Sequence, residues 1–439
     1  MVTRRDFLDT LALGAAGLAI GSTAKSYGQI LGSNDRLNFA VIGLHSRAYA
    51  HLSSLKANKA TARISHVCDV DSDILKKFAA DAGRELGYAP AMEKDFRHIL
   101  ALKEVDAVTI ATPDHWHAPM AIAALEAGKH VYVEKPCSHN PAEGALLVAA
   151  QQKYRKLAQM GTQQRSSPHT VEVVEKIRSG LIGRAYFAKA WYSNTRKSIG
   201  TGKVAPVPAQ LDWDLWQGPA PRREYKDNVH PYNWHWFRTW GTGETLNNGT
   251  HEVDVCRWAL GADFPRRVTA SGGRYHFKDD WEFYDTLVTN FDYGDKMISW
   301  DGKCCQGMKY YGRDRGSAIM GTTGTVVVDR DGYEVYDLAG KKVSEVIAGK
   351  GTTSADLTGQ DTMTDAHFAN FIGGIRNGER LHAPVSVGNV AVTMLQLSNI
   401  AWEVKRELAL DTRDGKILND AEAMKMWGRA YESGWEPHL

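Results

Sequence analysis

One stretch, residues 106–136, constrains the fold of the chain more than any other part of the sequence. It contains two short apolar runs, residues 107–111 and 130–133, which are rich in β-branched side chains. Such runs are typical of strands that are buried on both faces of a parallel sheet. Between them, residues 119–127 have the pattern of a helix, and Gly128 ends it. The order of these segments predicts a β-α-β unit.

The polar segments that follow the two predicted strands are the first candidates for a ligand site. They are Thr112-Pro113-Asp114-His115-Trp116-His117 and Glu134-Lys135-Pro136. In open parallel sheets, ligands bind just beyond the carboxyl ends of the strands. We therefore expect both segments to lie at one edge of a sheet, beside a bound molecule.

Together, the two segments resemble the Gfo/Idh/MocA family of NAD(P)-dependent sugar oxidoreductases, in the residues themselves and in their separation. The resemblance extends over nearly all of the chain from Leu37 onward. It implies an α/β protein: an N-terminal Rossmann dinucleotide-binding domain, and a C-terminal α+β domain with a large open, mostly antiparallel sheet. The cofactor contacts that it implies in these segments are Thr112, Pro113, His115, Trp116, His117, Glu134 and Lys135.

The first predicted strand, residues 37–42, ends at a turn that matches the dinucleotide fingerprint only in part. Gly43 permits the tight turn, but His45 stands where the second glycine belongs, and Ala48 occupies the third position. We expect Gly43 and the following Ser46 and Arg47 to contact the cofactor at a helix N-terminus. His45 leaves two alternatives: the diphosphate lies farther from the backbone, or the side chain points outward.

A second predicted strand, residues 64–69, ends at an acidic residue. A carboxylate about 20 residues after the glycine turn accepts hydrogen bonds from the ribose hydroxyls of a dinucleotide, and Asp69 has that position. The next residue is Val70 rather than an arginine, so the sequence favours NAD over NADP. The alternative is that Asp69 only caps the helix predicted to begin near Asp71.

A second specific element, residues 241–254, resembles the family segment that carries a catalytic histidine. His251 matches that histidine, and Asn247 stands where many members have an aspartate. Hydride transfer from an alcohol requires a base and a cation beside the developing alkoxide. We assign His251 as the base, Lys135 as the cation and Asn247 as the orienting group, with Lys135 as the alternative base.

Because residues 252–260 are predicted to be helical, His251 lies near a helix N-terminus, which favours a neutral imidazole. The resemblance also places Gln163 or Gln164 close to the nicotinamide, and we select Gln164. The residues that we expect to contact the substrate are Arg165, Tyr232, His235, Asn248 and His251.

Length and composition indicate two domains of a soluble protein. The 439 residues are too many for one ordinary core. A net charge of +2 gives no indication of nucleic acid or an anionic membrane surface. We predict an NAD-binding Rossmann domain over residues 37–160 and a substrate-binding and oligomerisation domain over residues 161–439. In the second domain, helices over residues 365–376 and 387–407 should cover one face of the sheet, and its open face predicts a homo-oligomer, either a dimer or a tetramer.

The amino terminus has the pattern of an export signal. Arg4-Arg5 precedes an apolar stretch, residues 11–20, that is too short to span a bilayer. We read residues 1–24 as a Tat signal peptide and residues 25–36 as a linker, which predicts a periplasmic or exported protein without a membrane span in the mature chain. The five cysteines have no ligand spacing, so we expect no metal site.

The leading functional hypothesis is an NAD-dependent oxidoreductase that transfers hydride between nicotinamide and a hydroxyl or keto carbon of a sugar, glycoside or cyclitol. One alternative is a redox-neutral NAD-dependent glycosidase that uses transient oxidation and elimination. Such proteins carry a Tyr-Pro-Thr-His motif where this chain has Asn248-Gly-Thr-His251, which argues against it. The second alternative is a non-catalytic sugar-binding protein, and the presence of Lys135 and His251 argues against that.

Overall fold

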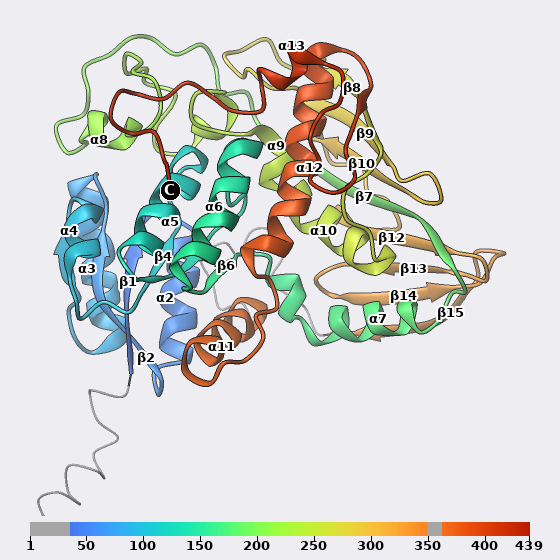
Figure 1. The fold of residues 1–439 in the computed structure, drawn as a ribbon, viewed down its shortest axis with the longest axis horizontal. Coiled ribbons are helices and arrows are strands. Elements are labelled where there is room, and N and C mark those ends of the chain that lie inside the picture. The colour runs from blue at the N-terminus through green and yellow to red at the C-terminus, as the bar shows by residue number, and fades with distance from the viewer. Residues whose placement is uncertain (1–35, 349–361) are drawn as a thin grey trace, which may run out of the picture.

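The computed structural model describes residues 36–348 and 362–439 and arranges them around two separate sheets (Figure 1). The predicted signal peptide and all but the last residue of the predicted linker lie outside the described residues. No helix in the described ranges is both long and apolar enough to cross a membrane.

The first sheet has six parallel strands in the order β3-β2-β1-β4-β5-β6 within the described residues. The order reverses between β1 and β4, which is where ligands bind in doubly wound sheets. Strands β1, β4 and β5 are almost wholly buried, as their apolar sequences predict. The strands are β1 Leu37–Ile42, β2 Ala62–Cys68, β3 Ala91–Glu93, β4 Ala107–Ile110, β5 His130–Val133 and β6 Ala158–Met160; the helices between them are α2 Ala48–Ala57, α3 Ser72–Leu86, α4 Phe96–Ala101, α5 Asp114–Glu126 and α6 Pro141–Tyr154.

Helix α5 begins at Asp114, five residues earlier than the sequence predicts, and it contains Pro119. Proline has no backbone N–H, so the carbonyl of His115, four residues earlier, loses its donor within the helix. Arg429 in the C-terminal segment supplies a donor instead, with Nη2 at 2.7 Å from the His115 oxygen. A distant contact therefore compensates for the proline.

The second sheet has ten strands in the described residues, and its neighbours are antiparallel except for β7 and β10. Its order is β15-β14-β13-β12-β7-β10-β9-β8-β16, and β11 pairs with β7 alone. The mixed sheet confirms the predicted α+β fold of the second part. The strands are β7 Ala185–Thr195, β8 Arg267–Gly273, β9 Thr286–Asp292, β10 Met297–Lys303, β11 Cys305–Gln306, β12 Arg315–Gly321, β13 Thr325–Val328, β14 Gly332–Tyr336, β15 Lys342–Ile347 and β16 Leu408–Ala409.

The helices of the second part divide between the two sheets, and one of them corrects a prediction. Helix α10, Gly249–Leu260, packs on β7, β10 and β12, while α12, Val385–Val404, packs on β8 and on α6 of the first part (Figure 1). Helix α11, Thr362–Asn377, was predicted to cover the large sheet but packs on α2 instead. Its Phe368 ring stacks on Tyr132 of β5 with centroids 4.2 Å apart.

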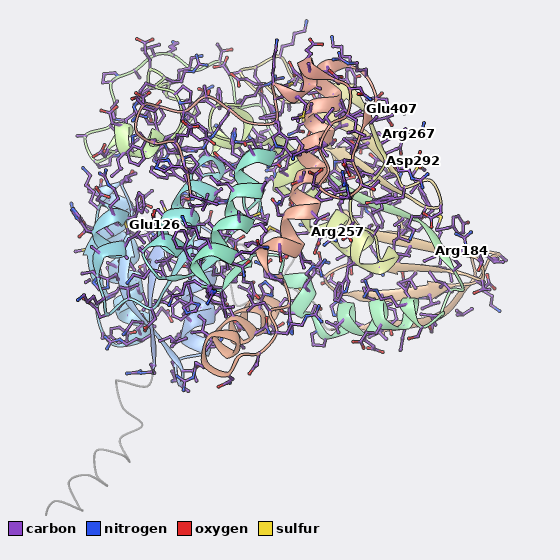
Figure 2. All side chains as sticks on the ribbon, in the orientation of Figure 1. Glu126, Arg184, Arg257, Arg267, Asp292 and Glu407 are labelled. Atoms are coloured by element: carbon purple, nitrogen blue, oxygen red, sulfur yellow. The ribbon has the colours of Figure 1, made fainter. Side chains whose placement is uncertain are left out.

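Charged side chains join these elements at several places labelled in Figure 2. Arg257 on α10 donates from Nη2 to the Val387 carbonyl of α12 at 2.8 Å. At the edge of the large sheet, Arg267 pairs with Asp292 and approaches Glu407 at 3.7 Å. The remaining short elements are α7 Pro168–Arg178, α8 Trp213–Gln217, α9 Gly243–Asn247, α13 Ala421–Met424, η1 Gln163–Ser166 and η2 Asn233–Trp236.

Residues 196–242, here called the bridging segment, run from β7 to α9 and lie over the first sheet. Six aromatic side chains form much of its own buried cluster. Its backbone is hydrogen-bonded to the segment after β2: Ser72 N–H donates to Gln210 at 2.9 Å, and Asp212 N–H donates to Val70 at 3.1 Å. The cluster residues are Trp213, Trp216, Tyr225, Trp234, Phe237 and Trp240.

Candidate active site

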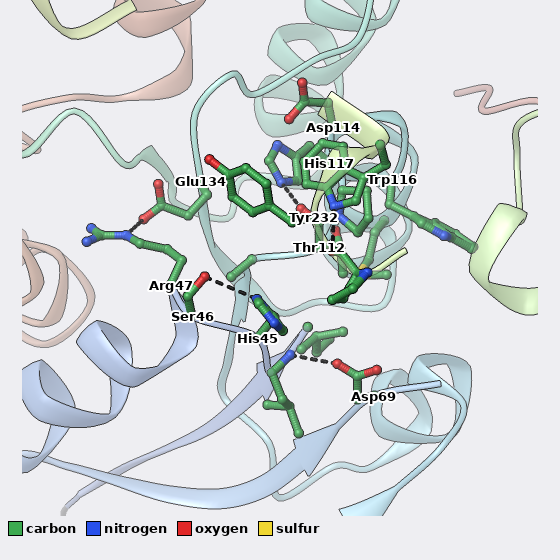
Figure 3. Close-up of a pocket in the computed structure, with 18 of the residues that line it drawn as sticks. His45, Ser46, Arg47, Asp69, Thr112, Asp114, Trp116, His117, Glu134 and Tyr232 are labelled. Carbon is green, nitrogen blue, oxygen red and sulfur yellow. Dashed lines mark hydrogen bonds and ion pairs between the residues drawn. The ribbon is translucent and has the colours of Figure 1, made fainter. Parts of the chain in front are cut away.

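A large cavity lies at the carboxyl edge of the first sheet, between that sheet and the bridging segment (Figure 3). Most of the predicted site residues line it, although they come from segments far apart in the sequence. Those that line it are Gly43, Ser46, Arg47, Asp69, Thr112, Pro113, Trp116, His117, Glu134, Lys135, Tyr232, His235, Asn247 and His251.

The turn after β1 brings the backbone of two strands very close together. Gly43 has φ +81°, and a Cβ on it would lie 2.7 Å from the backbone of Ala111 and Thr112. Only glycine fits both the conformation and the space. The turn leaves the start of α2 open to the cavity, as a bound diphosphate requires.

Asp69 lies at the end of β2 and faces the same cavity. Its carboxylate accepts hydrogen bonds from the N–H groups of Leu44 at 2.7 Å and Asp71 at 2.9 Å. Burial raises the pKa of Asp69 to about 6, against those hydrogen bonds. Asp71, not Asp69, caps α3, because its side chain accepts from Asp73 and Ile74. The capping alternative for Asp69 is therefore wrong.

Glu134 is buried and fully occupied by protein partners. Its Oε1 accepts from Arg47 Nε at 2.7 Å (Figure 3). The same oxygen lies 3.0 Å from His51 Nε2 and 3.4 Å from Gln163 Nε2. Burial alone would raise the pKa of Glu134, but Arg47 and His51 outweigh it and hold the pKa well below its ordinary value. Glu134 thus holds the side chains of Arg47 and His51 at α2, and that of Gln163 in η1, beside Lys135.

Lys135 reaches across the cavity to the second part of the protein. Its Nζ donates to the backbone oxygen of Asn247 at 2.7 Å and to Asn247 Oδ1 at 3.1 Å. Burial lowers the pKa of Lys135, while the carboxylates of Glu134 and Asp114 oppose that shift. The three predicted catalytic residues therefore line one cavity, and two of them are in direct contact.

His251 lies in the first turn of α10 and is 5% exposed. Its Nδ1 is buried and has no hydrogen-bond partner in the described ranges. Burial, followed by the positive charges of Arg330 and Lys135, holds the pKa of His251 well below its ordinary value. A neutral imidazole of this kind can accept a proton from a substrate hydroxyl.

A second imidazole, that of His235, enters the cavity from the bridging segment. Its Nδ1 lies 2.6 Å from the Tyr232 carbonyl, which fixes the proton on that nitrogen. The ring stacks on Trp234 at 3.6 Å, and burial holds its pKa well below the ordinary value. Tyr232 is held in turn by Arg196, whose Nη1 lies 3.2 Å from the phenol oxygen.

The histidines of the Thr-Pro-Asp-His-Trp-His segment connect parts of the protein rather than offering free nitrogens. His115 does not line the cavity; its Nε2 lies 3.0 Å from the Trp216 carbonyl, and Trp116 Nε1 donates to the same oxygen. His117 lines the cavity, but its nitrogens lie 2.6 Å from the Pro136 carbonyl and 2.8 Å from that of Thr112. We therefore withdraw the cofactor contact predicted for His115.

Three further predicted residues lie outside the cavity lining. Gln164 is buried behind it, and the preceding residue, Gln163, takes the expected place. Arg165 forms a buried two-point ion pair with Asp254, at 2.5 and 2.8 Å, that joins η1 to α10. Asn248 donates to Glu244. The segments are thus the right ones, but these three side chains are not part of the cavity lining.

Several lining residues were not selected from the sequence. Asp114 lies within the segment of residues 112–117, whereas Lys94 follows β3, outside every segment that carries a motif. His230 and Trp234 come from the bridging segment, and Arg330 comes from the turn between β13 and β14. The last three reach the cavity only through packing between the two parts.

The family models agree with this architecture. Residues 37–162 match a model described as an oxidoreductase family with an NAD-binding Rossmann fold, and residues 184–320 match the model of that family's C-terminal α/β domain. The glycine turn, the Asp69 carboxylate and the open cavity are the features that such a cofactor requires.

Individual relatives are more distant. A glycosyl hydrolase family 109 protein of Saccharopolyspora erythraea is 30% identical over 216 residues, covering 45% of this chain and 47% of the relative. Inositol 2-dehydrogenase 1 of the same organism is 32% identical over 157 residues, covering 36% and 45%. The chain thus spans about half the length of the curated relatives it matches. A levoglucosan dehydrogenase solved with NADH and L-sorbose superposes with TM-score 0.67 at 19% identity, covering 86% of this chain and 100% of that chain, and this shows a shared fold.

Proposed function

The chain is a member of the Gfo/Idh/MocA oxidoreductase family, and from that premise we propose that it uses NAD to transfer hydride to or from a carbon of a sugar, glycoside or cyclitol. The observation that carries the proposal is the meeting of Lys135, from the first sheet, with Asn247 and His251, from the second part, in one cavity. That cavity is continuous with the glycine turn and Asp69.

Lys135 and His251 have separate roles in the proposed reaction: one stabilises charge and the other transfers a proton. A bound NAD supplies the ring carbon that accepts or gives the hydride. Lys135 stabilises the negative charge that develops on the substrate oxygen, because its ammonium group is fixed by Asn247. His251 takes the hydroxyl proton, and its low pKa keeps it neutral for that step.

NAD is proposed over NADP because a lysine that lines the same cavity as Asp69 is already paired. Lys94, which follows β3 and lines the cavity, lies 2.9 Å from Asp212. A 2′-phosphate would have to break that ion pair and would also meet the Asp69 carboxylate. Parallel titrations with NADH and NADPH test this, and tighter binding of NADPH would contradict it.

The function is tested by incubating the purified protein, first examined for bound nucleotide, with NAD and a panel of sugars and cyclitols. Net formation of NADH, followed by absorbance, supports the proposal. If the protein binds no nucleotide and shows no turnover, the proposal fails, and a sugar-binding protein without catalytic activity is the remaining hypothesis.

A second candidate, redox-neutral cleavage of a glycosidic bond, is favoured by the second imidazole. Elimination next to a transient ketone needs a group that removes the proton from the neighbouring carbon, in addition to the base for the hydroxyl. His235 has its Nδ1 fixed by Tyr232 and lines the cavity with His251. The family 109 relative has a name consistent with such an activity.

Aryl glycosides separate the two candidates. Release of the phenol without net NADH, together with exchange of the proton beside the oxidised carbon for solvent deuterium, supports cleavage. If His235→Gln releases the phenol as fast as the native chain does, His235 takes no part in the cleavage.

We also propose export and self-association, each with its own test. Arg4-Arg5 before an apolar stretch supports Tat export, and exchange of both for lysine should retain the precursor in the cytoplasm. Val288 and Met297 are exposed on the face of the large sheet opposite α10, which supports a homo-oligomer. A monomeric mass in solution would contradict that.

A further inference from the structure

Two histidines with no assigned role line the cavity from different parts of the protein. His45 comes from the turn between β1 and α2, and His230 comes from the bridging segment. Both line the same cavity as Asp69. The two histidines therefore come from different parts of the protein and line one cavity.

His45 occupies the position in the dinucleotide fingerprint where backbone and diphosphate normally approach each other. Its side chain is exposed to the cavity, and its Nδ1 lies 3.1 Å from Ser46 Oγ (Figure 3). Within the described chain, its Nε2 has no hydrogen-bond partner. A histidine here keeps the cradle at the start of α2 accessible and adds a donor to it.

His230 approaches from the opposite wall. Its imidazole makes no hydrogen bond with any described residue, and the Trp216 ring stands behind it at 6.1 Å. The carboxylate of Asp71 acts to raise the pKa of both imidazoles, and His45 acts to lower that of His230. Each ring thus has a nitrogen available to a ligand between them.

We propose that His45 and His230 hold the anionic diphosphate of the dinucleotide between the two parts of the protein. The C-terminal part then helps to retain the cofactor through successive turnovers, beyond its contact with the substrate. This rests on the proposed function only in that the ligand is a dinucleotide. Imidazolium N–H donors bind phosphate oxygens through charge-assisted hydrogen bonds.

The clamp makes cofactor affinity depend on pH. Burial and then Lys77 lower the pKa of His45 in the empty site, and Asp71 opposes them. For His230, burial lowers the pKa, Asp71 raises it and His45 lowers it. Since a bound diphosphate raises both pKa values, the added affinity is complete below the empty-site pKa values and is lost as the pH rises above those of the complex.

Asp69 gives the opposite dependence and must be separated from the clamp. Its carboxylate binds ribose hydroxyls only when ionised, so affinity falls below its pKa of about 6. Adenosine contains the ribose but no phosphate, whereas ADP contains both. Comparison of these two ligands therefore isolates the diphosphate contribution.

The test is calorimetric titration of the cofactor-free protein with NADH, ADP and adenosine at pH 6 and pH 8, for the native chain, His45→Gln and His230→Gln. At pH 6, each variant should bind NADH and ADP roughly ten-fold more weakly, and adenosine equally well. Loss of affinity between pH 6 and pH 8 should shrink in both variants. His230→Gln should also release NADH faster in stopped-flow fluorescence.

The matched control is His98→Gln, which removes an exposed histidine of α4 outside the cavity. Equal affinity of the native chain and both clamp variants for ADP would overturn the clamp while leaving NAD binding intact. Equal weakening of adenosine and ADP would overturn it too, since the histidines would then act on the nucleoside. A native chain that binds none of the three ligands would instead defeat the proposed function.

Discussion

The two walls of the cavity hold their polar groups in opposite ways. On the wall of the first sheet, Glu134 is saturated by Arg47 and His51, and Asp69 accepts two backbone N–H groups. On the opposite wall, among the residues that the structure describes, His251 has a buried nitrogen without a partner and His235 is hydrogen-bonded at only one nitrogen. The carboxylates of the first wall are therefore fixed in position, whereas the imidazoles of the second wall keep nitrogens that can exchange protons.

From this difference we propose that the first wall mainly binds ligands and that proton transfer occurs on the second wall, with Lys135 between them. Its backbone belongs to the first wall, but its ammonium group is held by Asn247 of the second. Perturbing each wall separately should therefore change different measured quantities.

The largest effect is expected where the walls meet. Lys135→Met should lower kcat by about 10²- to 10³-fold, because the developing alkoxide loses its cation. NADH affinity, measured by fluorescence titration, should remain within a few-fold. Lys129→Met is the matched control, since it removes a buried lysine of the same sheet that lies outside the cavity. If the two variants have comparable kcat values, Lys135 does not stabilise the developing alkoxide.

The next largest effect tests the rigidity of the first wall. Gly43→Ala should lower the free energy of unfolding by about 2–4 kcal/mol, because the new Cβ would press on the backbone directly after β4 at a positive φ. Gly87 has φ +78° with nothing within 4 Å, so Gly87→Ala should cost only about 1 kcal/mol. Urea denaturation measures both, and equal losses would mean that the close approach adds nothing.

The sequence predicted the first wall better than the second, for a physical reason. Strands β1 and β5 were predicted to the residue, because short apolar runs bounded by turns are local signals. Helix α11 was given the wrong partner, since an amphipathic pattern reveals an apolar face but not what covers it. The start of α5 was missed because Arg429, far along the chain, satisfies the carbonyl that Pro119 leaves unpaired.

The same limit applied within the site. Gln163 and Gln164 are adjacent in a 3₁₀ turn, and only the three-dimensional packing decides which one faces the cavity. His230 carried no sequence signal, since its place depends on how the bridging segment lies over the first sheet. Motifs located the segments, and tertiary contacts selected the side chains.

A smaller effect is expected at the ribose end of the first wall. Asp69→Ala should weaken NADH binding by about 10- to 100-fold through loss of charge-assisted hydrogen bonds, with little change in kcat at saturation. In the native chain, affinity for adenosine, which has the ribose but no phosphate, should fall about ten-fold per pH unit below pH 6, where the carboxyl takes up a proton. Asp71→Ala removes the cap of α3 and should cost about 1 kcal/mol of stability. If affinity still falls at acidic pH in Asp69→Ala, a group other than Asp69 causes the pH dependence.

The smallest change distinguishes the two assignments of the base. Asn247→Asp places a carboxylate at the oxygen that now lies 3.1 Å from Lys135 Nζ, so the pKa of Lys135 should rise. If Lys135 acts as the cation and His251 as the base, the alkaline limb of the pH profile of kcat should move to higher pH. The rate at neutral pH should then change only a few-fold.

If Lys135 were the base, the same substitution would make it harder to deprotonate, and the acidic limb would move to higher pH with a loss of rate at neutral pH. The two assignments thus predict shifts of opposite limbs from one exchange of nearly equal volume. Because Asn247 belongs to the second wall and Lys135 to the first, the limb that moves also reports which wall performs the proton transfer.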